Sequence, residues 1–560
     1  MDSETKKSTL SGFDKWSQIF MLIGLLATPL LFWPAFGMSL EAIKKLFLAG
    51  TVVVALILWF VARLKTKNLT IPRTALWAIA AVLLVVMAVS GLVSGAAWSS
   101  FLGLGAETGT VYSMLVFFGL AFLATEYSLS KQKFAKLYVG LFSVFAVAFL
   151  FQLSRYLFGN YLPWSIFDQG ATNLIGKWND LGIFAGLVAL STTVMLEFFP
   201  LKQAKGLKIF LWSSLVAGLL TLALVNFFQL WGVLAVFSLV IFILGLTVLS
   251  HGKKKYLRIS SVLFVVSVLF LLFGAPLNYD AQGKAHEGYL AKQSRVISEK
   301  LKIASLEVRP SWRGTVMVVS STWKKDVFFG VGPNHFSNAW LAYKPSGVND
   351  SQFWNIEPEF GVGLLPTFFV TTGLLGGLAI LAFVLYLLYV GFKALLNPKI
   401  DPLDKSFLLL SFVGAAYGWT LLSMYVPQSP MLAIIFALTG LFIARLVDAG
   451  QVRLAVQPLA VNPRTKFIST ISSIVVGVIF LLVAYGWVAS VGAVTLIQRA
   501  GAAMAKNDPD KALTSIKKAI VLNPEDIYYR TAAQVNLNQM AALSAKKLTQ
   551  EQAMAEYSKY

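Results

Sequence analysis

The sequence predicts an all-α protein that crosses a membrane many times. Of its 560 residues, 57% are hydrophobic and only 13% are charged, whereas a soluble domain needs roughly 25% charged residues to cover its surface. The mean hydropathy of +0.71 agrees with this. The third observation is a series of long apolar runs, because a membrane-spanning helix needs roughly 20 mostly apolar residues. About thirteen such runs occur, centred near residues 27, 54, 84, 117, 145, 190, 216, 239, 266, 377, 415, 438 and 480.

Each apolar run is expected to be an α-helix, because a segment in lipid must satisfy its backbone hydrogen bonds internally. The charges between the runs predict the topology. Loops after the even-numbered runs are basic, as the positive-inside rule expects of cytoplasmic loops. This places the N-terminus in the cytoplasm and the C-terminus outside it. The basic residues that carry the pattern are Arg63, Lys65, Lys67, Arg73, Lys131, Lys133, Lys136, Lys202, Lys205, Lys208, Lys253, Lys254, Lys255, Arg258, Lys393, Lys399, Arg445, Arg453, Arg464 and Lys466.

Composition also narrows the function. A net charge of +21 suits a nucleic-acid-binding protein, but here the charge collects in short loops, where membrane topology explains it. We therefore expect no nucleic-acid partner. The chain has no cysteine, which excludes disulfides and thiolate metal sites. His251 and His286 have no partners at metal-ligand spacing, and no G-x-x-x-x-G-K phosphate loop occurs. We expect neither a metal nor a cofactor.

The pattern divides the chain into four predicted segments. They are an N-terminal transmembrane bundle (1–274), an extracytoplasmic loop (275–362), C-terminal transmembrane helices (363–494) and an extracytoplasmic helical tail (495–560). The second segment is much longer than an ordinary connection, and loops of such length are functional or disordered. Its aromatic residues favour an ordered cap over a linker: Trp312, Trp323, Trp340 and Trp354.

The tail differs in character from the rest of the chain. Four apolar residues recur at helical spacing, and Asn523-Pro524 ends the helix; they are Ala512, Ile516, Ala519 and Ile520. The segment resembles the second helix of a tetratricopeptide repeat, and a plain amphipathic helical hairpin is the alternative. One repeat cannot bury its own face. Either more repeats follow in a longer chain, or the tail docks on the cap, and a protein partner at the tail is expected.

The central stretch, Arg309 to Gly376, contains the residues that point to chemistry. Arg309 and Arg313 lie four apart, so they share one face if the segment is helical. Guanidinium groups bind phosphate oxygens in bidentate fashion, and the pair is predicted to clamp a pyrophosphate. Lys324 follows as a further phosphate contact. The alternative is that these are ordinary positive charges facing lipid headgroups, which is the favoured interpretation for the lysine.

A glycine-rich turn follows in the same stretch. Gly330, Gly332 and Pro333 form G-V-G-P, a tight turn whose backbone amides can approach a ligand closely. By itself this motif is common. Its spacing after Trp312-Arg313 is more specific.

Together these motifs resemble the conserved region of the O-antigen ligase and polymerase superfamily. That family has an Arg-x-x-Trp-Arg opening, a Gly-x-Gly-Pro-x-x-Phe turn and a Gly-Leu-Leu-Gly start to the next span. The matching residues are Arg309, Trp312, Arg313, Gly330, Gly332, Pro333, Phe336 and Gly373 to Gly376. The resemblance covers about seventy residues by motif. It covers most of the chain by topology, since the family has about a dozen spans and one large late periplasmic loop.

The resemblance implies an inverting, metal-independent glycosyltransferase in the bacterial cytoplasmic (inner) membrane. Its donor would be a glycan on a polyprenyl pyrophosphate, and its acceptor a hydroxyl of a glycan, lipid or protein. In the family, arginines hold the pyrophosphate and a histidine near the last span is the proposed base. Lys177, with Trp178 and Asn179, resembles an Asn-rich family segment near the lipid donor and is a second predicted phosphate contact.

The chain departs from the family pattern in two places. Residues 353–366 contain no histidine where the family has a His-Asn pair, and 227–232 contain no arginine where the family has Ser-Arg-Gly. Three residues are proposed as replacement bases: His335, Glu357 and Glu359. For His335 the alternative is a turn residue, and for each glutamate a solvated loop charge. Two other functions stay open, a non-catalytic relative that presents its tail to partners and a polyprenyl-glycan transporter.

Overall fold

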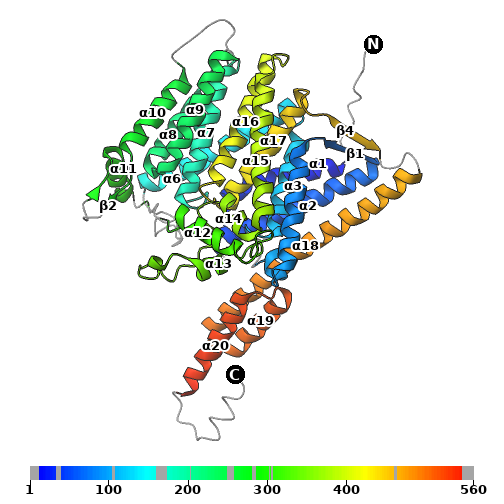
Figure 1. Cartoon of the computed structure of the whole chain (residues 1–560), viewed down its shortest axis with the longest axis vertical. Helices are drawn as coiled ribbons and strands as arrows, with labels where there is room; N and C mark the ends of the chain where they lie inside the picture. Colours follow the sequence, from blue (N-terminus) through cyan, green and yellow to red (C-terminus); the bar gives the residue numbers. More distant parts are fainter. Residues whose placement is uncertain are drawn as a thin grey trace.

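A computed structural model describes residues 12–32, 39–103, 107–158, 173–201, 204–248, 258–279, 285–301, 303, 307–458 and 463–544. Nearly all of its regular structure is helical (Figure 1). Within the described part of the chain, eleven helices are long and apolar enough to cross a membrane. They are α2 (Leu40–Thr66), α3 (Ala75–Val93), α5 (Val111–Ser128), α6 (Lys131–Phe158), α7 (Trp178–Phe198), α8 (Lys205–Val225), α9 (Phe228–Thr247), α15 (Gly373–Leu396), α16 (Pro402–Leu422), α17 (Ser429–Asp448) and α18 (Pro463–Ala505). The predicted all-α, multi-pass architecture is confirmed.

Two of the predicted spans correspond to shorter helices. The runs near residues 27 and 266 give α1 (Gly12–Ala27) and α10 (Ile259–Phe273), which fall short of the length that crosses a bilayer unaided. The smaller helices are η1 (Thr28–Leu30), α4 (Ala97–Phe101), α11 (Tyr289–Lys300), α12 (Trp312–Trp323), α13 (Phe336–Tyr343), η4 (Ser346–Val348), α14 (Leu364–Thr371), α19 (Pro509–Leu522) and α20 (Asp526–Ser544). Two antiparallel ribbons complete the described structure: β1 (Asn68–Pro72) with β4 (Leu454–Pro458), and β2 (Asn278–Tyr279) with β3 (Ala285–His286).

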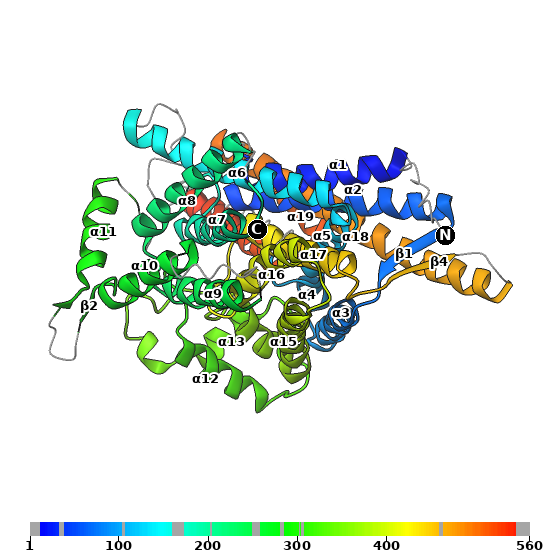
Figure 2. The same ribbon diagram turned by 90° about the horizontal axis from the view of Figure 1, so that it is seen from above.

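The core of the bundle is built around α7, α16 and α17. In the most apolar 18-residue stretch of each helix, 83%, 89% and 94% of the residues, respectively, are buried within the protein. Figure 2 shows α16 and α17 in the middle of the bundle. Phe436 of α17 packs its ring against Phe117 and Trp419 at centroid distances of 5.2 and 5.3 Å. The indole of Trp419 donates to Thr439 Oγ1 at 2.9 Å, so this polar group is satisfied inside the apolar core.

The loops alternate between the two ends of the bundle as the sequence predicts. At one end, Gln428 Nε2 donates to Glu41 Oε2 at 2.7 Å, and the cap helices α12 and α13 lie beside α14 (Figure 1). At the other end, the β1–β4 ribbon joins two of the basic loops, and Lys131 pairs with Asp404 and Asp448. The segments predicted to be extracytoplasmic thus share one end. That this end faces outward remains a prediction.

The predicted span near residue 377 is divided into α14 and α15. Gly373 has a φ of +63° at the break, a conformation that favours glycine. The turn of residues 327–332 fills the break: Val331 N donates to Val370 O at 3.1 Å, Gly332 N donates to Thr371 O at 2.8 Å, and Leu374 N donates to Val327 O at 2.7 Å. The long helix α15 therefore starts at Gly373 and lies mostly after the predicted centre near residue 377, because the end of the cap occupies the break before it.

The tail packs on the helix that leads into it. α18 runs without interruption through residue 494, so the boundary predicted between 494 and 495 lies inside a helix. Ala512, Ile516 and Ala519 are fully buried against the end of α18, as their spacing predicts. Asn523 joins the tail to the loop before α5, accepting from Trp98 Nε1 at 2.5 Å and donating to Gly103 O at 3.0 Å. The tail therefore docks at the cap end of the bundle.

Candidate functional site

A polar cavity of about 230 Å³ lies between the cap and the end of the transmembrane bundle. Three residues predicted to belong to the site line it: Lys177, Arg309 and Glu359. They come from the start of α7, from the chain before α12 and from the loop before α14. Glu41, Glu307, Tyr425 and Gln428 also line it. The cavity therefore joins segments that are far apart in sequence.

Arg309 lies before α12 and its side chain is half-buried. Its Nη1 donates to the carbonyl oxygen of Met424 at 2.8 Å. Its Cζ lies 5.3 Å from the ring centroid of Phe227 and 5.2 Å from that of Tyr425, so aromatic rings flank the guanidinium. Burial lowers the pKa of Arg309, and the Glu307 charge opposes this shift. An arginine stays charged under such a shift and keeps further N–H donors to offer a ligand.

Glu307 pairs with Lys177, the second cation of the cavity. The sequence did not point to Glu307 as a site residue. Its carboxylate pairs with Lys177 Nζ and accepts from Asn179 Nδ2 at 3.1 Å and from Tyr425 OH at 2.9 Å. Burial acts to lower the pKa of Lys177, but the charge and hydrogen bond of Glu307 outweigh it and raise that pKa. One signal was present: Glu307 lies two residues before Arg309, and such residues share a side of an extended chain.

A second group of contacts fixes the segment that carries Lys177. Lys44 Nζ donates to the carbonyl oxygens of Pro29 at 2.9 Å and Ile175 at 3.1 Å. Asp180 accepts from the backbone N–H of Lys177 at 3.3 Å and of Gln428 at 3.4 Å. Both Lys44 and Asp180 are buried. These two side chains therefore join three segments of the cavity wall.

The two predicted glutamate bases differ in position. Glu359 is exposed and lines the cavity, whereas Glu357 is exposed and is not among the lining residues. The alternative interpretation of a solvated loop charge therefore describes Glu357 better. Glu359 is the proposed base that lies beside Arg309 and Lys177.

His335 lies away from this cavity, at the residue before α13. Its Nε2 is 2.9 Å from Ser99 Oγ and its Nδ1 is 3.3 Å from Ser100 Oγ, both in α4. Burial lowers the pKa of His335, although hydrogen bonds with the backbone of Pro333 and Gly332 oppose the shift. These contacts match the alternative of a turn residue that fastens the cap to the loop containing α4.

The predicted clamp of two arginines is not formed. α12 begins at Trp312 with Ser311 as its N-cap, so Arg309 precedes the helix and does not share a helical face with Arg313. Arg313 is exposed in the first turn of α12, and Lys324 is exposed just after its last residue. Neither lines the cavity.

The glycine-rich turn has a structural use. Gly330 and Gly332 have φ angles of +68° and +98°, and a Cβ on Gly330 would lie 2.3 Å from Val370 O. The Gly332 amide is already bonded to α14, and Pro333 is buried. The motif predicts that these amides face a ligand. They face the α14–α15 break instead, because the turn is what closes it.

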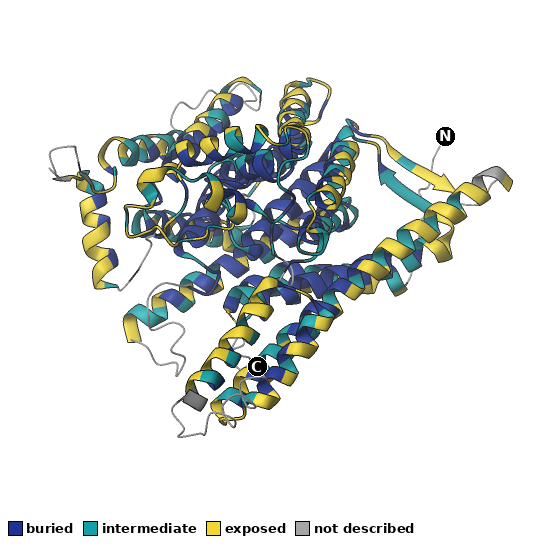
Figure 3. Ribbon diagram, turned by 60° about the horizontal axis from the view of Figure 1, so that its bottom comes forward, coloured by how far each residue is buried: buried dark blue, intermediate teal, exposed yellow. Residues whose placement is uncertain are grey.

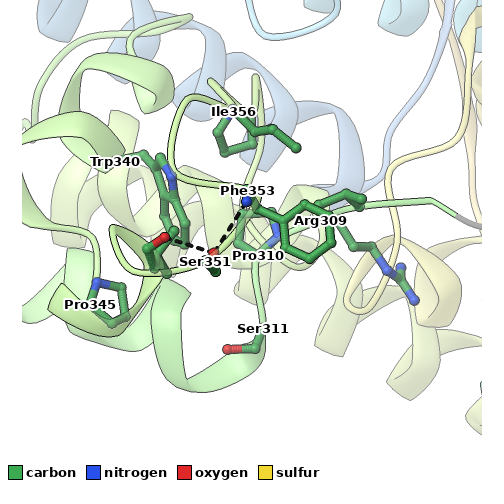
Figure 4. Close-up of a pocket in the computed structure, with 11 residues that line it drawn as sticks. Arg309, Pro310, Ser311, Trp340, Pro345, Ser351, Phe353 and Ile356 are labelled. Atoms are coloured by element: carbon green, nitrogen blue, oxygen red, sulfur yellow. Dashed lines mark hydrogen bonds between the residues drawn. The ribbon is translucent and has the colours of Figure 1, made fainter.

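A second cavity of about 220 Å³ adjoins the first on the outer side of the cap. The two share Val308, Arg309, Pro310 and Pro358 as lining residues. Figure 4 shows the Arg309 side chain directed away from Trp340 and Pro345, which form another part of the wall. The guanidinium therefore serves the polar cavity, and the outer cavity is mainly apolar.

Comparisons with known proteins add no relatives: no model of a known protein family matches the chain, and no similar curated protein is found. Among the residues that the structure describes, no three His, Asp or Glu side chains gather as metal ligands do.

Proposed function

We propose that this protein is an inverting, metal-independent glycosyltransferase that moves a glycan from a polyprenyl pyrophosphate to an acceptor hydroxyl, as O-antigen ligases do. One observation carries the proposal. Lys177, Arg309 and Glu359, chosen from the sequence for this chemistry, line one cavity at the end of a membrane-spanning bundle. On this proposal the protein lies in the bacterial cytoplasmic membrane with the cavity on its outer side.

The charges of the cavity favour Arg309 as the main pyrophosphate contact. Lys45 pairs with Glu41 at 3.1 Å, and Lys177 pairs with Glu307. Arg309 has no carboxylate partner among the described residues' ion pairs, so its charge is the least compensated. A guanidinium binds two phosphate oxygens at once, and the flanking rings of Phe227 and Tyr425 hold it in place.

Glu359 is the base in the proposed reaction. Its carboxylate takes the proton of the acceptor hydroxyl as that oxygen bonds to the anomeric carbon, on the face opposite the pyrophosphate. The bond between the anomeric carbon and the pyrophosphate oxygen breaks, and polyprenyl pyrophosphate leaves with the electron pair. Arg309 and Lys177 stabilise the charge that develops on this leaving group.

The test is glycan transfer by the purified protein. A polyprenyl-pyrophosphate-linked oligosaccharide is mixed with glycan, lipid and protein acceptors in the presence of a metal chelator. We expect a labelled acceptor with inverted configuration at the transferred sugar, and loss of transfer in Glu359→Gln with donor binding retained. Donor binding without transfer by the wild type would instead favour a non-catalytic relative. Transport of the donor without transfer would favour the transporter.

A further inference from the structure

A groove of about 560 Å³ lies at the opposite end of the bundle from the polar cavity. It is bounded by the last turns of α2, the β1–β4 ribbon and the first half of α18, which project from one side of the bundle in Figure 2. Its walls are largely apolar and include Phe60, Leu64, Leu69 and Ile468. The proposed function does not use this groove.

The groove exists because α18 diverges from α2. Further along α18, the helices are in contact: the ring of Phe480 packs against Phe60 at 5.4 Å, and Trp487 Nε1 donates to Leu46 O at 2.8 Å. Before that contact, α18 presents small side chains to the groove, namely Ser469, Ser472 and Ser473. Figure 3 shows this half of α18 largely exposed. The groove is therefore the space left between α2 and α18 where the two helices move apart.

The size and lining of the groove select its occupant. An α-helix with side chains is about 10 Å across and rises about 5.4 Å per turn, so the groove would hold little more than one turn of a partner helix. A polar ligand would lose its hydration against apolar walls. An acyl chain is narrow and apolar, so it can fill the groove without burying a polar group. The surrounding bilayer supplies such chains.

The mouth of the groove suits a phosphate. Arg63 lines it, with its Cζ 6.0 Å from the ring centroid of Trp59, one turn earlier in α2. Arg63 Nη2 pairs with Asp14, and among the described residues Nη1 makes only a long 3.5 Å contact with Thr70 Oγ1, which leaves donor capacity for an anion. Exposed basic residues also flank the groove, at the end of α2 and the start of α18: Lys65, Lys67 and Lys466.

We propose that this groove is a binding site for an anionic glycerophospholipid. One acyl chain lies between α2 and α18, and the phosphate bonds to Arg63. The site is independent of glycan transfer, since it lies at the other end of the helices. The lipid fills the space that the serines of α18 leave open and joins α18 to the bundle.

The absence of cysteine allows a direct test. Ser472→Cys places a label in the groove, and Ile474→Cys places one on the opposite, 60% exposed side of α18. Each variant is labelled with bimane at its cysteine and placed in phosphatidylcholine nanodiscs. Increasing fractions of nitroxide-labelled lipid are then added, either phosphatidylglycerol or phosphatidylcholine, each with the nitroxide on an acyl chain. At Cys-labelled position 472 we expect saturable quenching with about five-fold preference for phosphatidylglycerol, the effect of one basic residue beside an anionic lipid.

Two comparisons complete the test. Position 474 faces bulk lipid and should be quenched equally by both lipids. Arg63→Gln should lower the preference at position 472 several-fold while quenching persists, and Lys65, Lys67 and Lys466 supply the preference that is left. In the protein that keeps Arg63, equal quenching by both lipids at position 472 would overturn the proposal. So would weak quenching by either lipid there, because it would mean that protein, including a second copy of this chain, covers the groove.

Discussion

Among single residues, Glu307 has the largest structural effect on the polar cavity. It accepts from Lys177, Asn179 and Tyr425, and these partners lie 130, 128 and 118 positions away. Local sequence patterns identify residue types and helix faces, and they place Glu307 on the same side of an extended chain as Arg309, but they do not show which distant residues it contacts. For this reason Arg309 and Lys177 were found from motifs, whereas the carboxylate that organises them was not.

Glu307→Gln should strengthen donor binding. The substitution keeps the size of the side chain but removes the negative charge that compensates Lys177 and acts on Arg309, so both cations attract the pyrophosphate more strongly. A charge-assisted contact of about 1.5 kcal/mol corresponds to roughly ten-fold in affinity, and we expect a fall of up to about ten-fold in the donor KM with a smaller effect on kcat. The melting temperature should change little, because Lys177 is 45% exposed and such pairs contribute at most about 1 kcal/mol. An unchanged donor KM would contradict this role.

Gly330→Ala should destabilise the protein. The residue has a φ of +68°, and its new Cβ would lie 2.3 Å from Val370 O. Such backbone strain costs about 1–3 kcal/mol, which thermal unfolding in detergent would detect. Gly347→Ala is the matched control in the same cap, since nothing lies within 4 Å of its Cβ. Equal melting temperatures for the two variants would show that the turn is not needed to close the α14–α15 break.

At the scale of elements, hydropathy predicts where helices lie better than how they end. Most predicted centres fall inside long helices, because the length of an apolar run is a local property. The break at Gly373 lies inside an apolar run, and its cause is the turn of residues 327–332, which docks there from the cap. The uninterrupted course of α18 into the tail is likewise fixed by packing against α19.

Docking of the tail should weaken as pH rises through about 7. Glu525 is buried beside the docking residue Asn523, and burial, with the charges of Glu107 and Asp526, raises its pKa from 4.5 to about 7. A carboxyl whose pKa is higher when docked favours docking below its ordinary pKa, and this contribution is lost above the raised value. Limited proteolysis between α18 and α19 at pH 5 and pH 8.5 measures the difference.

Glu525→Gln is the control for the titration, because the amide keeps the shape of the side chain and cannot ionise. Its proteolysis rate should be the same at both pH values. Asn523→Ala removes the hydrogen bonds to Trp98 and Gly103 and should increase cleavage at either pH. A pH effect that persists in Glu525→Gln would assign the titration to another group.

At the scale of the whole molecule, the alternation of basic and non-basic loops predicts which segments meet. The structure brings the loops of each class to its own end of the bundle. The polar cavity arises where the non-basic loops converge, so the topology inferred from charge located the site in general terms. The topology could not predict that Arg309 lines the cavity whereas Arg313 does not, because this difference depends on α12 starting at Trp312.

Cysteine labelling tests the predicted orientation. Lys324→Cys lies at the cap end and Lys399→Cys at the basic end, and both positions are exposed. In intact spheroplasts, a membrane-impermeant maleimide should label position 324 at once and position 399 only after permeabilisation. The reverse pattern would place the polar cavity in the cytoplasm and exclude a periplasmic transfer reaction.

The role of Arg309 as the pyrophosphate contact is tested by donor binding and transfer in Arg309→Ala compared with Arg295→Ala. Arg295 is an exposed arginine of the same segment, predicted to be extracytoplasmic, and it pairs with Glu287 and Glu299. We predict a loss of roughly 100-fold in transfer for Arg309→Ala, as expected for a half-buried charge that meets a phosphate. Arg309→Lys should restore little, because lysine cannot bind in bidentate fashion, and Arg295→Ala should match the wild type. Transfer in Arg309→Ala at the rate of the Arg295→Ala protein would contradict the account.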